Sequence, residues 1–189
     1  MLQFNFTPFP VVETENLFLR QIHSNDAKEV FALRSNAETM KFIPRPLAET
    51  IEDAEKFITE CNESIAKNDL LNWAIATKED DKLIGMIGFF RMQPENFRGE
   101  IGYILNPNFH GRGIMKEATE RALKYGFEIL NFHSIEAVID PNNSSSEKLL
   151  QRTGFTKEAH FKENFFYKDA FLDTVIYSLL KKDWQFQQK

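Results

Sequence analysis

Three apolar segments separated only by short turns constrain the fold of this chain most. They are residues 72–76 (NWAIA), 83–92 (LIGMIGFFRM) and 100–105 (EIGYIL), with polar or breaker-rich turns at 78–81 and 94–99. Strands joined by connections this short pair as antiparallel hairpins, because a parallel neighbour needs a long crossover. The segments therefore predict an antiparallel meander and argue against a doubly wound Rossmann sheet.

Hydrophobic periodicity predicts four helices and four further strands around this meander. Strands are expected over 16–22, 134–139, 155–161 and 173–179, and helices over 26–33, 51–65, 114–130 and 145–153. Asp26 and Glu29 have the spacing of a capping box at the start of the first helix. We therefore expect one α+β domain over residues 1–189, with a predominantly antiparallel, seven-stranded mixed sheet and about four helices.

Charge and cysteine content narrow the class of protein. The formal net charge is −5, which argues against a general nucleic-acid binder and favours cationic partners such as amines or basic protein tails. Cys61 is the single cysteine and lies on the apolar face of a predicted helix, which predicts a buried thiol and no intrachain disulfide. The first residues, MLQFNFTPFP, lack the basic and apolar regions of a signal peptide, and no apolar run is long enough to span a bilayer. We expect a cytoplasmic protein that does not contact membranes.

The segment from Glu100 to Lys116 contains the pattern most indicative of chemistry. Gly111 and Gly113 flank Arg112 between a predicted strand and a long amphipathic helix. Glycines let the backbone approach a ligand closely, and the free N–H groups of a helix start bind phosphate. The pattern lacks the Lys-Ser/Thr of a nucleotide-triphosphate loop and the third glycine of a dinucleotide fingerprint. A phosphate-binding loop and an ordinary tight loop both remain open on this pattern alone.

The segment Asn108–Gly113 (NFHGRG) resembles the acetyl-CoA pyrophosphate loop of the GNAT superfamily of N-acetyltransferases. Four segments resemble the ribosomal-protein N-terminal-alanine acetyltransferase branch (RimJ/RimL type) of this superfamily. They are TENLFLRQI (14–22), EIGYILNPNFHGRGIMKEA (100–118) around the loop, PNNSSSEKLLQRTGF (141–155) and DTVIYSLLKKDW (173–184). The similarity covers about residues 14–184. Asn108 stands where the superfamily usually has Gln or Arg, and His110 where this branch often has Trp.

The resemblance implies a sheet splayed between the fourth and fifth strands and a binding site for acetyl-CoA as cosubstrate. Ile104 and Leu105 would contact pantetheine through their backbones, and an N–H there could polarise the thioester carbonyl. The diphosphate would be bound by His110, Gly111, Arg112, Gly113, Ile114 and Met115. Asn143 would bind the pantetheine amides, and Ser146 would protonate the departing thiolate. Without the resemblance, Ile104 and Leu105 are plain sheet residues, and 141–146 is a turn with a helix cap.

Attack by an amine requires a base, and Glu100 at the start of its strand is the first candidate. A solvated carboxylate at a strand end is the alternative for Glu100. Asp173 matches an acidic residue common in the branch, for which we expect a structural or acceptor-positioning role. The four histidines show no metal spacing, and no zinc or serine-hydrolase motif is present.

These observations predict an acetyl-CoA-dependent N-acetyltransferase without a metal, in which a primary amine attacks directly in a ternary complex. The expected acceptor is a protein N-terminal α-amine of the ribosomal-protein alanine type, and a small polyamine or an antibiotic amine is the alternative. A non-catalytic acyl-CoA-binding module is the alternative from another class. We expect no nucleic-acid partner, and a homodimer remains open because the Phe-rich terminal segments could form an interface.

Overall fold

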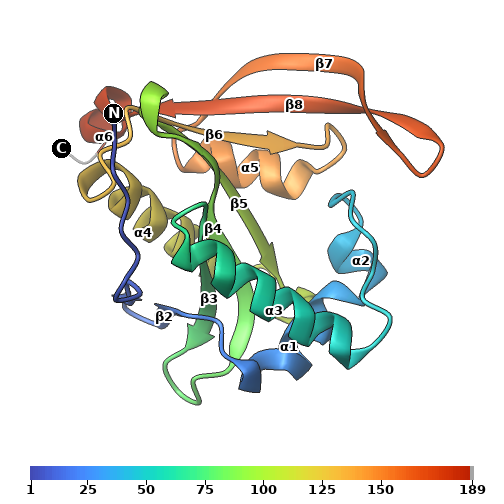
Figure 1. The fold of residues 1–189 in the computed structure, drawn as a ribbon. Coiled ribbons are helices and arrows are strands. Elements are labelled where there is room, and N and C mark those ends of the chain that lie inside the picture. The colour runs from blue at the N-terminus through green and yellow to red at the C-terminus, as the bar shows by residue number, and fades with distance from the viewer. Residues whose placement is uncertain (188–189) are drawn as a thin grey trace.

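One eight-stranded sheet forms the centre of the protein in the computed structural model, which describes residues 1–187 (Figure 1). The order across the sheet is β1-β2-β3-β4-β5-β6-β8-β7, and every neighbouring pair is antiparallel except β5 and β6. The strands are β1 (Val12–Glu13), β2 (Leu17–Arg20), β3 (Leu71–Thr77), β4 (Leu83–Gln93), β5 (Arg98–Leu105), β6 (Ser134–Ile139), β7 (Thr156–Tyr167) and β8 (Ala170–Leu180).

Six α-helices accompany the sheet within the described residues. They are α1 (Ala27–Arg34), α2 (Ala37–Met40), α3 (Ile51–Ala66), α4 (Ile114–Glu128), α5 (Ser144–Arg152) and α6 (Lys181–Gln187). The predicted mixed, mostly antiparallel fold is confirmed. The counts of seven strands and about four helices were too low, because they lack β1, α2 and α6, which have two, four and seven residues. Elements this short carry no measurable hydrophobic periodicity.

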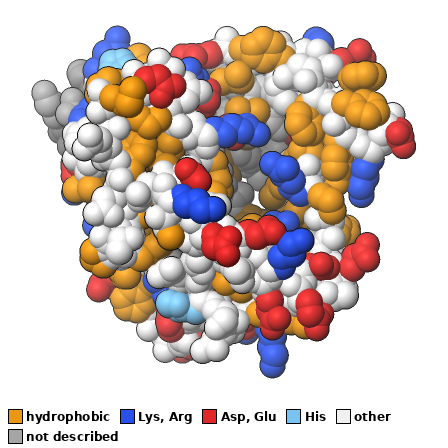
Figure 2. Space-filling view, in the orientation of Figure 1, with side chains coloured by type: hydrophobic (Ala, Val, Ile, Leu, Met, Phe, Trp, Pro, Cys, Tyr) orange, Lys and Arg blue, Asp and Glu red, His pale blue; other side chains and the backbone are white. Residues whose placement is uncertain are grey.

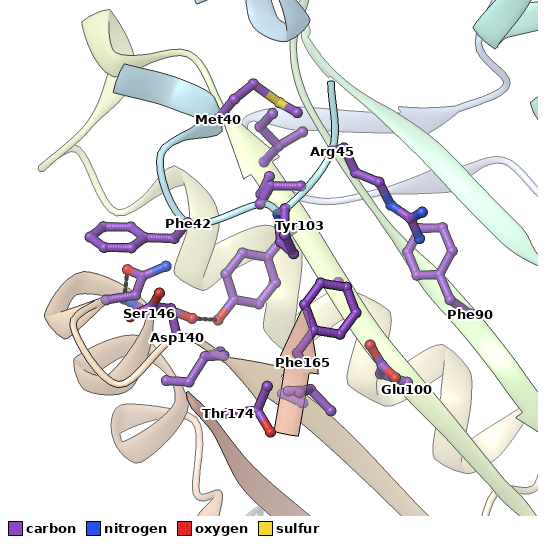
Figure 3. A pocket seen from close by; sticks show the side chains of 18 of the residues that line it. Met40, Phe42, Arg45, Phe90, Glu100, Tyr103, Asp140, Ser146, Phe165 and Thr174 are labelled. Atoms are coloured by element: carbon purple, nitrogen blue, oxygen red, sulfur yellow. Dashed lines mark hydrogen bonds between the residues drawn. The ribbon is translucent and has the colours of Figure 1, made fainter. Parts of the chain in front are cut away.

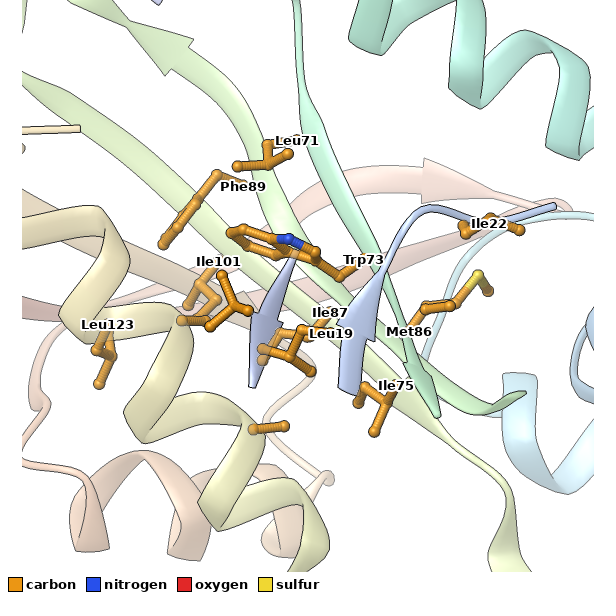
Figure 4. Packing of buried hydrophobic residues seen from close by; sticks show 14 of the residues in the cluster. Leu19, Ile22, Leu71, Trp73, Ile75, Met86, Ile87, Phe89, Ile101 and Leu123 are labelled. Atoms are coloured by element: carbon orange, nitrogen blue, oxygen red, sulfur yellow. The ribbon is translucent and has the colours of Figure 1, made fainter. Parts of the chain in front are cut away.

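Alternation along β3 places α3 and α4 on opposite faces of the sheet. Asn72 faces α3, where its Nδ2 donates to Cys61 Sγ at 3.5 Å. The next residue, Trp73, faces α4, where its ring centroid lies 5.3 Å from that of Tyr125 in an edge-to-face contact. Trp73 is fully buried among aliphatic and aromatic side chains, including Phe89 (Figure 4). The sheet thus separates two layers that can bind different ligands.

The sheet opens between β5 and β6. The two strands pair in parallel only where Arg98–Glu100 lie beside Ser134–Glu136, and the ribbons diverge beyond that point (Figure 1). The split leaves the β6-facing backbone of residues 101–105 without a strand partner among the described residues. The expected splay is confirmed, since β5 and β6 are the fourth and fifth of the seven predicted strands.

Two sequence predictions about individual side chains have different outcomes. Cys61 is a free thiol and 6% exposed, and burial raises its pKa, so the predicted buried thiol is confirmed. The predicted capping box of Asp26 with Glu29 was wrong. The Asp26 carboxylate instead accepts hydrogen bonds from the Arg20 guanidinium and from the His23 backbone N–H. Among the residues described, no helix combines the length and apolar character needed to cross a membrane.

Candidate active site

A cavity of about 1240 Å³ lies where β5 and β6 separate. Its walls come from β4, β5 and β6, the end of α1, the helix α3 and its connection from α2, the start of α5 and the β7–β8 hairpin. Figure 2 shows the hollow in the middle of the face turned toward the viewer. The cavity therefore collects side chains from segments that are distant in the sequence.

The strand register determines which side of β5 each residue faces. Glu100 lies opposite Phe90 and Ile104 opposite Met86, and through β3 and β4 these positions share the α3 face. Tyr103 lies opposite Ile87, which shares the face of Trp73 and α4. Side chains of adjacent residues in a strand point to opposite faces. Glu100 and Tyr103 thus approach the split between β5 and β6 from different sides (Figure 3).

The surroundings of Glu100 raise the pKa of its carboxylate. Its side chain is 15% exposed, and its Oε2 accepts a hydrogen bond from Arg91 Nη1 at 2.7 Å. Burial raises the pKa of Glu100, although the charge and hydrogen bond of Arg91 act in the opposite direction. A base whose pKa is raised toward neutrality accepts a proton from an ammonium group more readily.

Ser146 lies at the first turn of α5 with its hydroxyl 2.7 Å from the Tyr103 hydroxyl (Figure 3). Burial raises the pKa of Tyr103 to about 12, so this phenol stays protonated at neutral pH and can donate to Ser146 Oγ. Tyr103 was not singled out from the sequence. Strand alternation was the only signal for it, and alternation does not identify the residue that faces it from α5.

Asn143 is the N-cap of α5, where its Oδ1 accepts a hydrogen bond from the Ser146 N–H at 3.1 Å. The Oδ1 of Asn143 therefore has the role that the helix-cap interpretation of 141–146 predicted. The Nδ2 of Asn143 donates to no protein group within the described residues, and Asn143 lines the cavity. The side-chain amide of Asn143 can therefore still donate a hydrogen bond from Nδ2 to a ligand carbonyl.

The glycine loop has the backbone expected for an anion site. Gly111 and Gly113 have φ values of +74° and +79°, and a Cβ on either would meet no atom within 4 Å. Glycine is favoured at both positions because the backbone is left-handed. Packing does not require glycine here, since a side chain would enter open space. Between Gly111 and Lys116, the backbone N–H groups have no acceptor within residues 1–187. These groups precede and begin the 15-residue helix α4, whose dipole favours negative charge at this end.

The remaining loop residues are arranged around this backbone. His110 places Nε2 3.2 Å from the Leu105 carbonyl oxygen, and the Arg112 guanidinium lies 5.3 Å from the centre of the Phe109 ring. Ile114 and Met115 are half-buried against the core at the start of α4. Leu105 lies opposite Gly85 on the α4 face, at the end of β5 nearest the loop.

The structure brings the predicted site residues together in two groups. Glu100, Ile104, Asn143 and Ser146 line the cavity. The loop 110–115 does not line it and follows the carboxyl end of β5. An extended ligand with an anionic end would fit this arrangement, with its anion on the loop and its chain along the free edge of β5.

Asp173 on β8 holds the β7–β8 hairpin together. It accepts hydrogen bonds from the Glu163 N–H at 2.9 Å and from His160 Nε2 at 2.7 Å, and Lys162 Nζ lies 3.2 Å away. The Glu163 N–H, with His160, lowers the pKa of Asp173 to about 2. No group of three or more His, Cys, Asp or Glu side chains in the described part of the chain could hold a metal ion.

The chain is similar to known acetyltransferases in sequence and in fold. A family model described as an acetyltransferase (GNAT) domain matches residues 16–156. The uncharacterized N-acetyltransferase YoaA of Bacillus subtilis is 33% identical over 173 residues, which cover 92% of this chain and 98% of that protein. The crystal structure of a GNAT-family acetyltransferase from Bacillus anthracis superposes with a TM-score of 0.82 at 28% identity, covering 92% of this chain and 99% of that one.

Two further similar proteins have names that state different acceptors. The crystal structure of a ribosomal-protein-S5-alanine acetyltransferase from Vibrio fischeri has a TM-score of 0.80 at 25% identity and covers 93% of this chain and 98% of that one. A spermidine N(1)-acetyltransferase of Vibrio cholerae is 26% identical over 168 residues, covering 89% of this chain and 95% of that protein. Acetyl transfer is common to these two names, while the acceptor that each states differs at nearly equal similarity.

Proposed function

The chain belongs to the GNAT acetyltransferase family as an N-acetyltransferase that uses acetyl-CoA, and we propose that its acceptor is a protein N-terminal α-amine that attacks directly in a ternary complex. The whole chain then forms one catalytic domain. The observation that carries the direct mechanism is the placement of Glu100 and the Tyr103–Ser146 pair on opposite sides of β5 in one cavity. An acid and a base arranged in this way need no covalent intermediate on the protein.

Binding uses mainly the backbone of this chain. Acetyl-CoA supplies the thioester that the amine attacks. The N–H groups of Gly111–Met115 and the Arg112 guanidinium bind its diphosphate, and the free edge of β5 at Ile104 and Leu105 binds the extended pantetheine. The Nδ2 of Asn143 donates to a pantetheine carbonyl. An N–H on this edge stabilises the negative charge that develops on the thioester oxygen.

Proton transfer is divided between the two sides of β5. Glu100 takes a proton from the amine as the new carbon–nitrogen bond forms on the α3 side. Ser146 donates its proton to the sulfur as the carbon–sulfur bond breaks, and Tyr103 holds the Ser146 hydroxyl in place at 2.7 Å. The Tyr103 phenol, which is protonated at neutral pH, then returns a proton to Ser146 and regains one from solvent.

The variant Glu100→Gln tests this assignment. Removal of a general base lowers kcat/KM by roughly 100-fold or more. The deficit should be larger at about pH 6.5 than at about pH 9, because neutral amine is scarce at the lower pH. The raised pKa means that the ionised carboxylate is less favourable in the folded chain than in the unfolded one, so the variant should not lose stability at neutral pH.

The matched control is Glu158→Gln, since Glu158 is an exposed carboxylate of β7 that forms no ion pair within residues 1–187 and lies outside the cavity lining. Equal rates for Glu100→Gln and wild type at both pH values would remove Glu100 from the mechanism. Transfer to spermidine and to no peptide amine would replace the protein acceptor by a polyamine, the acceptor in the name of the Vibrio cholerae relative. Binding of acetyl-CoA without transfer to any amine would indicate a non-catalytic module.

A further inference from the structure

The charged side chains around the cavity are unequally partnered. Three of its carboxylates have a cationic partner: Glu100 with Arg91, Asp173 with Lys162, and Glu60 with Lys56. Asp140 accepts hydrogen bonds only from the neutral N–H groups of Asn142. Asp69 also lines the cavity and is exposed just beyond the end of α3. Figure 2 shows both basic and acidic side chains around the hollow. Four cations of the lining form no ion pair within residues 1–187, namely Arg34, Lys41, Arg45 and Lys168, against two such carboxylates, Asp69 and Asp140. The unpaired charge at this cavity is therefore positive.

Two of the unpaired cations of the cavity are arginines. Arg34, at the end of α1, is half-buried with its guanidinium 4.2 Å from the centre of the Phe57 ring. Arg45 comes from the connection between α2 and α3 and extends into the cavity on the side where Phe90 and Glu100 lie (Figure 3). Within residues 1–187, neither side chain has a carboxylate within 4.0 Å or a hydrogen-bond partner.

Both guanidinium groups belong to residues that line this cavity, and their like charges repel. Burial lowers the pKa of Arg34, and the charge of Arg45 lowers it further, while Glu60 acts in the opposite direction without forming an ion pair. Holding two like charges around one cavity is unfavourable unless an anion binds between them. Guanidinium groups match the two oxygens of a carboxylate in geometry and charge.

The position of the two arginines separates them from the cofactor loop. Arg34 and Arg45 belong to the layer of α1 and α3, which pack against each other on one face of the sheet. The glycine loop begins α4, which packs on the other face. Glu100, the proposed base, faces the same layer as the arginines. An anion bound by Arg34 and Arg45 would therefore be part of the acceptor and not the diphosphate of acetyl-CoA.

We propose that the amine acceptor carries a carboxylate, which Arg34 and Arg45 bind on the α3 side of the cavity; the inference rests on the proposed function and names the substrate class of that site. The carboxylate can come from an acidic side chain near a peptide N-terminus or from the α-carboxylate of a small amino acid or dipeptide. Both sources present an amine and an anion in one molecule, unlike a polyamine.

Binding measurements on matched probes test this proposal without relying on turnover. Protein saturated with desulfo-CoA is titrated by calorimetry with alanyl-aspartate amide against alanyl-asparagine amide, and with alanyl-alanine against its amide. The first pair tests a side-chain carboxylate and the second a terminal one. We expect at least one carboxylate probe to bind roughly 10- to 100-fold more tightly than its neutral partner, as hydrogen bonds to charged groups predict.

Variants of the two arginines test whether they cause the preference for carboxylate probes over their neutral partners. Arg45→Gln should remove most of this preference, and Arg34→Gln tests the second guanidinium independently. Lys28→Gln is the matched control, because Lys28 is exposed on α1 with Arg34 and lies outside the cavity lining. Arg45→Gln changes an exposed side chain, so its folding is not expected to suffer.

The outcomes separate this proposal from the proposed function. Equal affinities within both probe pairs, or a preference that persists when both arginines are replaced, would overturn the carboxylate site. Acetylation of spermidine in preference to every carboxylate probe would also overturn it. Transfer to no amine, together with an arginine-dependent carboxylate preference, would remove the proposed function and support the carboxylate site.

Discussion

At the scale of single residues, long-range contacts decide what a side chain does. Asp26 has the sequence spacing of a helix cap, yet its two oxygens accept hydrogen bonds from Arg20 at 2.8 and 2.9 Å. Both side chains are about nine-tenths buried, and Arg20 also binds the more exposed Asp81. A buried charge that loses its partner is strongly destabilising, because the remaining ion has lost its hydration.

Asp26→Asn should therefore lower the free energy of unfolding by about 3–5 kcal/mol at neutral pH. Burial alone would raise the pKa of Asp26, but hydrogen bonds from Arg20 and the His23 N–H hold it below its ordinary value. A lowered pKa means that the stabilisation is complete above the ordinary carboxyl pKa, about 3.9, and is lost as pH falls through the lower folded value. Urea denaturation at neutral and acidic pH measures both effects.

Asp81→Asn is the control for this prediction. Asp81 binds the same arginine but is 62% exposed, so its loss should cost no more than about 1 kcal/mol. Equal destabilisation by the two variants at neutral pH would contradict the assignment of the buried pair to Asp26.

At the scale of elements, the β7–β8 hairpin forms one wall of the cavity and depends on Asp173. The register between the two strands shifts between Phe161 and Phe165, and Glu163 within that interval has a φ of +50°. Asp173 accepts the Glu163 N–H at 2.9 Å and thereby holds this irregular segment to β8. A bulge fixed in this way orients the cavity-lining residues of the hairpin.

Asp173→Ala should speed hydrogen exchange at the Glu163 amide and raise KM for the amine, with little change in kcat. The reason is that the variant loosens a wall of the cavity without touching Glu100 or Ser146. Because the pKa of Asp173 is lowered to about 2, the contact should persist at mildly acidic pH and be lost only as pH falls through about 2. Asp169→Asn, an exposed change at the hairpin turn, should leave both measurements unchanged. A fall in kcat with KM unaltered would show that Asp173 acts on the chemical step instead.

At the scale of the whole molecule, β5 and β6 join two parts of the sheet through only three residue pairs. A cosubstrate bound along the free edge of β5 adds contacts at this weak junction.

The net charge of the whole chain does not predict the charge of the ligand that its cavity binds. The net charge of −5 favours cationic partners, whereas the unpartnered arginines of the cavity favour an anion on the acceptor.

Acetyl-CoA should therefore stabilise the entire fold. A ligand at 100 times its Kd adds about 2.7 kcal/mol to the free energy of unfolding, so the Tm should rise with acetyl-CoA and with desulfo-CoA but not with ATP. The double variant Gly111→Val and Gly113→Val should lose this shift, because valine is strained at the positive φ values of both positions. An unchanged Tm at saturating acetyl-CoA would contradict the proposed cofactor site.

Much of the fold and part of the site could be predicted from local patterns. Alternation and short turns predict the meander of β3, β4 and β5, and the Gly-Arg-Gly spacing predicts the loop before α4. The outer half of the β7–β8 hairpin was underestimated, because β7 is exposed on both faces and has no regular alternation. Tyr103 was missed for a different reason, since its importance depends on Ser146, which lies 43 residues later.

The sequence by itself determined the elements whose cause is local: which residues alternate, where a helix begins, and where positive φ requires glycine. Only the tertiary structure decided that Glu100 shares one cavity with Arg34 and Arg45, while Tyr103 meets Ser146 on the other side of β5. Strand register and the split between β5 and β6 determine these neighbours. Both follow from packing between segments far apart in the chain, so no local pattern encodes which side chains will meet.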